Sequence, residues 1–400
     1  MVKRIQSRES NSADRPHISL AESYPEIREG VRTLCAQFPG PYWREKDRGR
    51  EYPAEFVKAL TEAGYLAALI PEIYGGSGLP ISAAVAILEE IHRSGCNGAA
   101  CHAQMYIMGT VLRHGSTEQK QRYLPKIASG ELRLQAFGVT EPSTGSDTTQ
   151  LRTMAVRDGE GYVVNGQKIW TSRAEYSDLL LLLARTTPLE KVKSRRHGLS
   201  VFLVNMREVE GLEIRPIRTM INHATTELFF RDMRIPADSL IGEEGEGFSY
   251  ILDGMNAERI LIGSESIGDT RFFIDRATSY AKDREIFDRP IGQNQGVQFP
   301  IARCHAAMEA AYLMVCKAAA LFDAGLNCGP EANMAKLLAG DAAWDAADMC
   351  MQTFGGFGFA EEYDIERKFR ESRLYQIAPI STNMVLGYIG QHVLGLPRSY

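Results

Sequence analysis

The sequence predicts an α+β protein in which a small sheet domain lies between two helical domains. Apolar residues recur at helical spacing over 21–133, at a period of two over 134–240, and at helical spacing again over 241–400. Residues 1–20 are polar and are expected to form a flexible arm. We therefore expect an N-terminal all-α domain, a central small β-barrel or sandwich, and a C-terminal four-helix bundle.

Composition excludes several function classes. The formal net charge of −5 offers no positive surface for nucleic acid or an anionic membrane, and no apolar run reaches the ~20 residues that span a bilayer. The seven cysteines are scattered without CxxC spacing, and the histidines do not cluster, so no metal site is expected. Residues 1–15 lack the apolar segment of a secretory signal, and we expect reduced thiols and a cytoplasmic location.

The N-terminal domain has recognisable helix boundaries. Pro53–Gly64 begins with proline and ends at glycine, and Ser116 with Gln119 resembles a capping box. The glycine-rich stretch Pro71–Gly78 lacks a P-loop lysine and is interpreted as a linking turn. The other helices expected in this domain are Ile81–Ser94, Ala99–His114 and Lys120–Ile127.

The sheet domain and the bundle are predicted from the same change of period. The expected strands are Leu132–Val139, Tyr162–Ser172, Asp178–Ala184, Leu199–Val204, Leu212–Ile217 and Glu227–Ile235. The expected bundle helices are Phe248–Leu261, Gly268–Arg284, Gly296–Leu321, Glu331–Met351 and Val385–Val393.

One stretch of the sheet domain carries the residue types of a cofactor site. Phe137–Asp147 is a strand followed by a turn rich in hydroxyl groups, and Asn165-Gly166 favours a two-residue hairpin turn. One arm of that hairpin ends in Trp170, followed by two hydroxyl residues. An aromatic plate beside hydroxyl donors suits a flat heteroaromatic group, although an ordinary hairpin with a core tryptophan has the same pattern.

Five motifs in this order resemble the acyl-CoA dehydrogenases over roughly residues 25–400. The first two are Gly138–Asp147, which departs from the family pattern at Thr144 and Gln150, and Asn165–Ser172. The other three are Arg284-Glu-Ile-Phe287, Gly292-Gln-Asn-Gln295 and Gln352-Thr-Phe-Gly-Gly-Phe-Gly358.

The resemblance implies FAD as cofactor, bound in part by a neighbouring subunit of a homodimer or homotetramer. Ser146 would also contact the CoA arm, together with Met255, Asn256 and Arg259. For Arg284 the alternative is a surface ion pair, and for Arg259 it is a structural ion pair. Gln295 and Gln352 could instead be helix-surface or capping residues. The FAD-binding residues implied are Phe137, Val139, Thr140, Gly145, Ser146, Trp170, Thr171, Ser172, Arg284, Ile286, Phe287, Gln295, Gln352, Gly355, Gly356, Ser381, Thr382 and Asn383.

The reaction of this family removes a proton next to a thioester carbonyl and therefore needs a shielded carboxylate. Many members carry it in a loop, but here the corresponding position is Pro379, and no Asp or Glu follows Ser372. Branched-chain and some long-chain members, isovaleryl-CoA dehydrogenase among them, place the glutamate on a helix, and Glu258 matches that position. The alternative is a Glu258 that faces solvent or pairs with an arginine.

The expected activity is dehydrogenation of a short or branched acyl-CoA to the 2-enoyl-CoA, as in fatty-acid β-oxidation, with electrons passed to an electron-transfer flavoprotein. A flavin oxidase or monooxygenase on the same fold is a second hypothesis, motivated by the altered loop at Pro379. A third is an acyl-CoA-binding relic that has lost its base.

Overall fold

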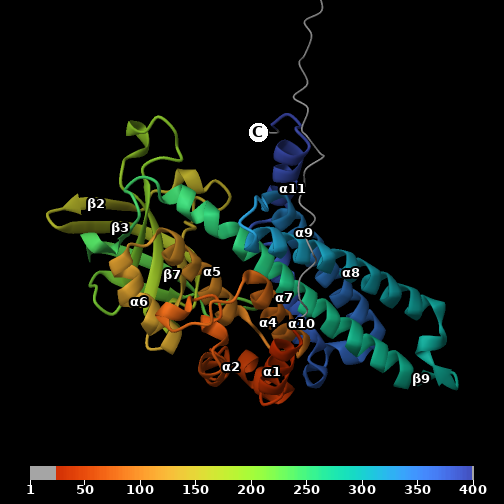
Figure 1. Cartoon of the computed structure of the whole chain (residues 1–400). Coiled ribbons are helices and arrows are strands. Elements are labelled where there is room, and N and C mark those ends of the chain that lie inside the picture. Colours follow the sequence, from red (N-terminus) through yellow and green to blue (C-terminus); the bar gives the residue numbers. More distant parts are fainter. Residues whose placement is uncertain (1–23, 399–400) are drawn as a thin grey trace, which may run out of the picture.

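The structure is a computed structural model that describes residues 24–398. The predicted arm, residues 1–20, lies outside the described residues. Figure 1 shows N-terminal helices in red and orange against a sheet at one end, and long helices extending away from both. The order of helical, β and helical parts agrees with the predicted α+β class.

The N-terminal part is helical up to the first strand. The predicted helix Ala99–His114 has the same bounds in the structure, and the Ser116–Gln119 capping box forms with both of its hydrogen bonds. The helices are α1 Pro25–Cys35, α2 Gly40–Gly49, α3 Ala54–Glu62, α4 Ile81–Arg93, α5 Ala99–His114 and α6 Thr117–Ser129.

One sheet has the strand order β6-β7-β3-β2-β4-β5-β8, and β1 pairs with β4 in parallel. Strand β4 is buried along its whole length because alternate leucines face two different cores, one shared with helices α5 and α6 and one inside the sheet domain. The strands are β1 Leu134–Gly138, β2 Met154–Asp158, β3 Gly161–Ser172, β4 Leu179–Arg185, β5 Leu199–Asn205, β6 Leu212–Pro216, β7 Thr225–Pro236 and β8 Leu240–Ile241.

The predicted hairpin turn at Asn165-Gly166 is wrong. Strand β3 passes through both residues, and the turn lies earlier, where Asp158 of β2 pairs with Gly161. Gly166 instead marks a shift in the register with β7, and its φ is 149°. The glycine is required there because a Cβ atom would lie 2.7 Å from the Cα atom of Thr153.

Replacing Gly166 by alanine is expected to destabilise the sheet domain. The new methyl group would overlap the Cα atom and the side chain of Thr153, which the bond from its N–H to Glu141 and the adjacent β2–β3 pairing hold in place. We expect a loss of about 1–3 kcal/mol, measured by chemical denaturation. Gly296→Ala, in α8 with open space around it, is the control and should be neutral or slightly stabilising. Equal stability of the two variants would contradict this account.

The C-terminal part is a bundle around one long helix, α7. The predicted pair Phe248–Leu261 and Gly268–Arg284 is wrong, because a single helix of 37 residues, Gly247–Asp283, covers both. Buried polar residues between them, Ser264 to Ser266 among others, interrupt the apolar pattern without interrupting the helix. At Gly268 a Cβ atom would lie 2.3 Å from a main-chain oxygen of α4, so this glycine permits the close packing of α4 on α7.

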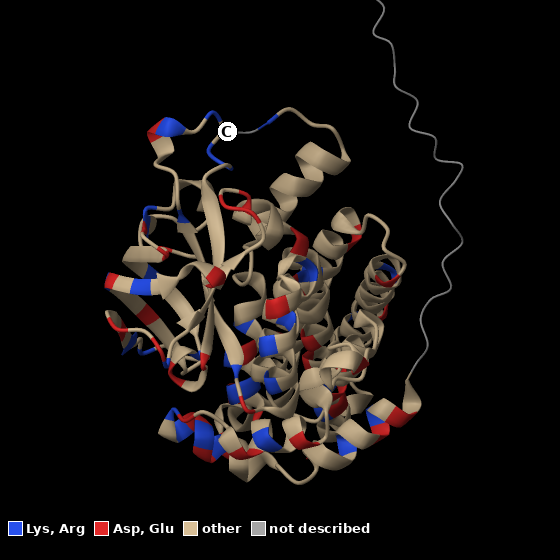
Figure 2. Cartoon of the chain, turned by 60° about the vertical axis from the view of Figure 1, so that its left-hand side comes forward, with Lys and Arg blue, Asp and Glu red and all other residues tan. Residues whose placement is uncertain are grey.

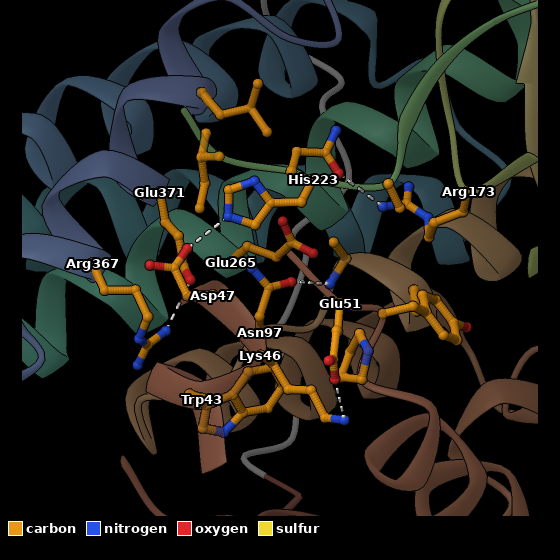
Figure 3. A pocket seen from close by; sticks show the side chains of 18 of the residues that line it. Trp43, Lys46, Asp47, Glu51, Asn97, Arg173, His223, Glu265, Arg367 and Glu371 are labelled. Atoms are coloured by element: carbon orange, nitrogen blue, oxygen red, sulfur yellow. Dashed lines mark hydrogen bonds and ion pairs between the residues drawn. The ribbon is translucent and has the colours of Figure 1, made fainter. Parts of the chain in front are cut away.

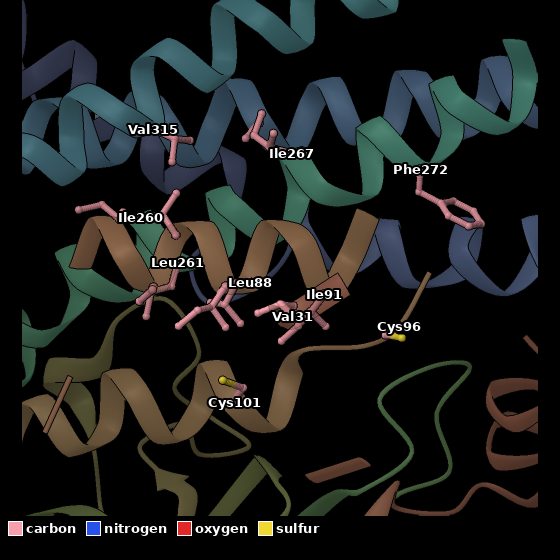
Figure 4. Packing of buried hydrophobic residues seen from close by; sticks show 14 of the residues in the cluster. Val31, Leu88, Ile91, Cys96, Cys101, Ile260, Leu261, Ile267, Phe272 and Val315 are labelled. Atoms are coloured by element: carbon pink, nitrogen blue, oxygen red, sulfur yellow. The ribbon is translucent and has the colours of Figure 1, made fainter. Parts of the chain in front are cut away.

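The other elements of this part complete the bundle. Figure 4 shows apolar side chains of α4, α7 and α8, including Leu88, Leu261 and Val315, packed into one core. The predicted helix Val385–Val393 is α-helical only to Tyr388 and then continues as a π-helical turn. The elements are β9 Glu285–Ile286, β10 Arg289–Pro290, α8 Gln295–Asp323, α9 Gly329–Phe354, α10 Ile365–Ser372 and α11 Thr382–Tyr388.

Two surface properties bear on the excluded function classes. In the view of Figure 2, positive and negative residues are intermixed, with no continuous basic stripe. Among the described residues, one helix, α8, is long and apolar enough to cross a bilayer by length and composition. It packs on α7 and α9, with 39% of its most apolar window buried, as a bundle helix with one exposed face would.

Candidate active site

The candidate base, Glu258, is buried in the middle of the molecule. Its residue is 7% exposed, so the solvent-facing alternative is wrong. Burial raises the pKa of the Glu258 carboxyl from its usual 4.5 to about 7, against the opposing effects of His102, Arg259 and Tyr106. A carboxylate shielded in this way is a stronger base than an exposed one.

Helix α5 connects Glu258 to the predicted cofactor wall. The Tyr106 hydroxyl interacts with the Glu258 carboxylate, and burial raises the pKa of Tyr106. The Tyr106 ring also meets Phe137 of β1 edge to face, with ring centroids 5.8 Å apart. The structure therefore brings the two predicted sites, about 120 residues apart in the chain, to one place.

A buried ion pair holds the cofactor wall together. The Nζ of Lys168 donates to the Val139 carbonyl and to the Glu141 carboxylate, at 2.9 Å each. Glu141 also accepts from the main-chain N–H groups of Arg152 and Thr153. These bonds, with that from the Ile169 N–H to the Thr140 carbonyl, lock the two predicted segments side by side.

The residues of this wall fit a flat ring with a polar edge. Trp170 has a φ of 61° and is 57% exposed, which leaves its indole ring free to cover a bound group. The Thr171 hydroxyl is buried without a hydrogen-bond partner, and the Ser172 hydroxyl accepts from Asn222 and can still donate. Gly145 and Ser146 are exposed at the rim.

The second predicted set of FAD residues lies far from the first. Arg284 follows α7, and its guanidinium lies 5.9 Å from the centre of the Phe357 ring; no ion pair of Arg284 is found among the described residues. Twenty-six residues separate Glu258 from Arg284, which is about 40 Å along a helix. The other members at this end, all exposed, are Ile286, Phe287, Gln295, Gln352, Gly355 and Gly356.

The segment that replaces the usual glutamate loop has structural partners. The Nζ of Lys336 donates to the Ile380 carbonyl at 2.8 Å, and the Ser381 hydroxyl caps α11 by accepting from the Met384 N–H. Thr382 donates to the Gln376 carbonyl, and Asn383 is exposed. The segment itself supplies no carboxylate that could serve as the base.

The predicted substrate residues surround Glu258 on α7. Arg259 is buried, donates to the Asn256 side chain at 2.9 Å and has an Nε without a partner. Burial lowers the pKa of its guanidinium. No ion pair of Arg259 within 4 Å is found among the described residues, against the ion-pair alternative. Met255 is half-buried beside the core that α7 shares with the sheet.

Sequence reasoning missed a buried polar network beside Glu258. Asp269 of α7 accepts from Tyr375 at 2.7 Å, from His92 at 3.0 Å, and from Lys368 at 2.5 Å. His92 Nε2 accepts from the Gly98 N–H, which assigns the ring proton to Nδ1. The separation of these residues in the chain hides the network, although four charged residues on the buried face of one helix are a signal for it.

Two histidines that the sequence left unassigned meet at one carboxylate. His92 Nε2 and His102 Nδ1 lie 3.7 Å and 3.2 Å from Glu265 Oε1. No group of three potential metal ligands occurs in residues 24–398. These histidines therefore belong to a polar network and not to a metal centre of that kind.

A cavity of about 110 Å³ lies next to this network. Figure 3 shows Glu265 near its centre, Arg173 on one side, and the helix α2 residues Trp43 and Lys46 at another. Arg173 of the sheet domain follows Ser172 directly, and its pKa is lowered by burial. The polar lining of the cavity was not predicted.

The comparisons with known proteins agree with this geometry. Three family models match consecutive parts of the chain: the acyl-CoA dehydrogenase N-terminal domain at 21–131, the middle domain at 136–233 and the C-terminal domain at 245–394. The chain belongs to the acyl-CoA dehydrogenase family. It is 34% identical to the acyl-CoA dehydrogenase FadE12 of Mycobacterium tuberculosis over 385 residues, which is 95% of this chain and 98% of that protein.

Solved structures of this family share the whole fold. A chain from a structure of the electron-transferring flavoprotein of Acidaminococcus fermentans is 30% identical, with a TM-score of 0.89, covering 94% of this chain and 99% of that one. The structure of PigA with FAD and proline is 25% identical, with a TM-score of 0.88, covering 94% and 99%. The predicted fold, the oxidoreductase class and FAD as the family's cofactor are thereby confirmed.

Proposed function

We propose that this acyl-CoA dehydrogenase family member oxidises a short or branched acyl-CoA to the 2-enoyl-CoA, with Glu258 as the catalytic base. The observation that carries the proposal is a buried carboxylate with a pKa of about 7 beside the cofactor wall. The position matches the helix-borne base of branched-chain members, and the small Ala378 and Pro379 leave room at the usual loop.

Each residue of the site has a definable task in this reaction. The Glu258 carboxylate accepts the proton from the carbon next to the thioester carbonyl, and the burial of Glu258 keeps water away from that carbon. Tyr106 holds the carboxylate in place from α5. FAD, when bound, supplies the hydride acceptor, and Trp170, Thr171 and Ser172 would hold its ring.

Glu265 is the competing carboxylate, because it is also buried on α7. The environment of Glu265 has the opposite net effect on its pKa. Burial alone would raise that pKa, but His102 and His92 outweigh burial, so the pKa of Glu265 lies below its usual value. An acid with a lowered pKa is a weak base at neutral pH. Glu258 is therefore the better candidate on electrostatic grounds.

An anaerobic screen of acyl-CoAs of graded length and branching tests the proposal. A substrate should bleach the absorbance of the bound flavin in the absence of oxygen. Oxygen consumption with a substrate other than a CoA thioester, and no bleaching by any acyl-CoA, would favour the oxidase or monooxygenase. Acyl-CoA binding without bleaching would identify a relic.

The arrangement of the two predicted FAD segments supports shared sites. Because about 40 Å of helix separates Glu258 from Arg284, we propose that the distal set binds the FAD of another subunit in a homodimer or homotetramer. Large apolar side chains at that end favour burial against a partner, since Phe287 is 92% and Phe359 76% exposed.

The remaining expectations concern the cell. We propose an electron-transfer flavoprotein as the acceptor, which is consistent with the solved structure of such a flavoprotein that contains a similar chain. A cytoplasmic location and a role in fatty-acid β-oxidation stay predictions. The proposed acceptor can be tested by asking whether substrate and this enzyme together reduce a purified electron-transfer flavoprotein.

The rate of flavin bleaching should depend on pH through Glu258. The carboxyl must be ionised to accept a proton, and its pKa of about 7 lies above its usual value, so activity rises with pH. We expect the single-turnover rate to increase about tenfold per pH unit below 7 and to level off above about 8. A rate constant that is flat from pH 5.5 to 8.5 would contradict the assignment.

A further inference from the structure

The space in front of the base continues toward a second polar site. Glu258 and Glu265 are seven residues apart on the buried face of α7, which places them two turns, or about 10 Å, apart along the helix. Tyr106 interacts with Glu258 and also lies close to the Arg173 guanidinium. Arg173 and Glu265 both line the cavity of Figure 3, which therefore lies about two helical turns along α7 from the catalytic base.

Most charged groups of the cavity are paired with one another. Arg367 contacts Glu371 at 2.8 Å, and Lys46 contacts Glu51 at 3.0 Å. Asp47 accepts from His223 at 2.7 Å and also contacts Arg370.

Among the described residues, Arg173 has no carboxylate partner within 4 Å, and Glu265 has only histidines near it. Arg173 donates from one terminal nitrogen to Asn222 at 3.3 Å, and its Nε has no partner within residues 24–398. Glu265 is 2% exposed, and its Oε1, although 3.2 Å from His102 Nδ1, lacks the alignment of a hydrogen bond. Arg173 Nε and Glu265 Oε1 are thus a buried donor and a buried acceptor without hydrogen-bond partners in the described part of the chain, beside the same cavity, as are Arg367 Nε and His223 Nδ1.

A hydroxyl group matches this pair better than the alternatives. A hydroxyl both accepts and donates one hydrogen bond, so it can accept from Arg173 and donate to Glu265. A carboxylate can accept from Arg173, but it would be repelled by Glu265. An alkyl end would leave both groups unsatisfied while displacing any water that serves them, which is costly.

We infer that the acyl group of the substrate carries a hydroxyl at its far end, held between Arg173 and Glu265. The inference rests on the proposed function and narrows its substrate. In an extended chain the carbon–carbon bonds zigzag, so each bond of about 1.5 Å advances the chain by only roughly 1.25 Å. A span of about 10 Å therefore corresponds to roughly eight bonds. A short acyl chain does not reach the pair, so of the two proposed substrate classes the inference excludes the short one and keeps acyl groups that extend about 10 Å from the reacting carbon.

The test uses the FAD-loaded enzyme with three CoA thioesters of equal length: 10-hydroxydecanoyl-CoA, decanoyl-CoA and decanedioyl-CoA. We expect kcat/KM for flavin bleaching to be at least about 100-fold higher for the hydroxyl compound than for the other two, because sites built to bind a hydroxyl reject analogues that lack it. Equal values, or preference for the alkyl or carboxylate compound, would overturn the inference.

Two variants locate the effect. Arg173→Met should bring the hydroxyl-to-alkyl ratio to within about threefold, whereas Arg48→Met, at an exposed arginine paired with Glu361, should leave the ratio unchanged. An unchanged ratio in Arg173→Met would exclude Arg173 from recognition.

A binding measurement separates this inference from the proposed function. In Glu258→Gln holoenzyme, titration of the same three thioesters, followed by flavin absorbance, should give a Kd at least about tenfold lower for the hydroxyl compound. This result is independent of turnover and of whether Arg173→Met folds. If all three bind equally, the inference fails. The proposed function fails only if no acyl-CoA of the graded screen bleaches the wild-type enzyme, and the Kd values decide the inference in either case.

Discussion

Glu258→Gln is expected to reduce the rate of substrate-dependent flavin bleaching by about 10²–10⁴-fold. Glutamine has nearly the shape of glutamate but cannot accept the proton, and no Asp or Glu follows Ser372 to replace it. Because the pKa of Glu258 is raised from 4.5 to about 7, the ionised carboxylate costs the folded protein about 3 kcal/mol at pH 8. The variant should therefore retain FAD and be at least as stable as wild type at that pH.

Glu265→Gln is the matched control for this prediction, since it changes the same group two turns away on the same helix. With 10-hydroxydecanoyl-CoA it should raise KM and leave the bleaching rate at saturation within about tenfold of wild type. Stopped-flow absorbance at saturating substrate separates the two variants. A Glu258→Gln variant that bleaches at the wild-type rate would exclude Glu258 as the base.

Lys368→Met is expected to destabilise the C-terminal domain by about 3–5 kcal/mol. The Lys368 ammonium is fully buried and contacts Asp269 at 2.5 Å and Glu371 at 2.7 Å. Methionine keeps most of the volume but leaves two buried carboxylates without their shared cation. Thermal unfolding of the holoenzyme should show a loss of roughly 10 °C in Tm.

The loss of stability caused by Lys368→Met should also depend on pH. Burial alone would raise the pKa of Asp269, but Lys368 and His92 outweigh burial, so the pKa lies below its usual value. The contribution of ionised Asp269 to the stability of the wild type is therefore lost only as pH falls through that lowered pKa. The deficit of the variant should therefore be present at pH 7 and shrink in acid. Lys58→Met removes an exposed pair with Glu62 and should change Tm by less than about 2 °C. A similar small change in Lys368→Met would contradict the role given to the network.

Local pattern was sufficient for most of the fold. Helix Ala99–His114 and the capping box at Ser116 were predicted from the spacing of apolar residues and caps alone. Prediction from local pattern failed where a residue type is required by a neighbour that is distant in the chain but close in the fold. Gly166 was interpreted as a turn residue, but it is a glycine because Thr153, directly before strand β2, approaches it.

The same limit applies to the site. The sequence by itself determined the family, the cofactor wall at Phe137–Ser172 and a candidate base at Glu258, because these depend on residue types at fixed spacing. The folded structure was needed to show that Glu258 is buried against Tyr106 and that Arg173 and Glu265 line one cavity. Their pKa shifts and unsatisfied hydrogen bonds arise from desolvation by elements far apart in the chain, which no local pattern encodes.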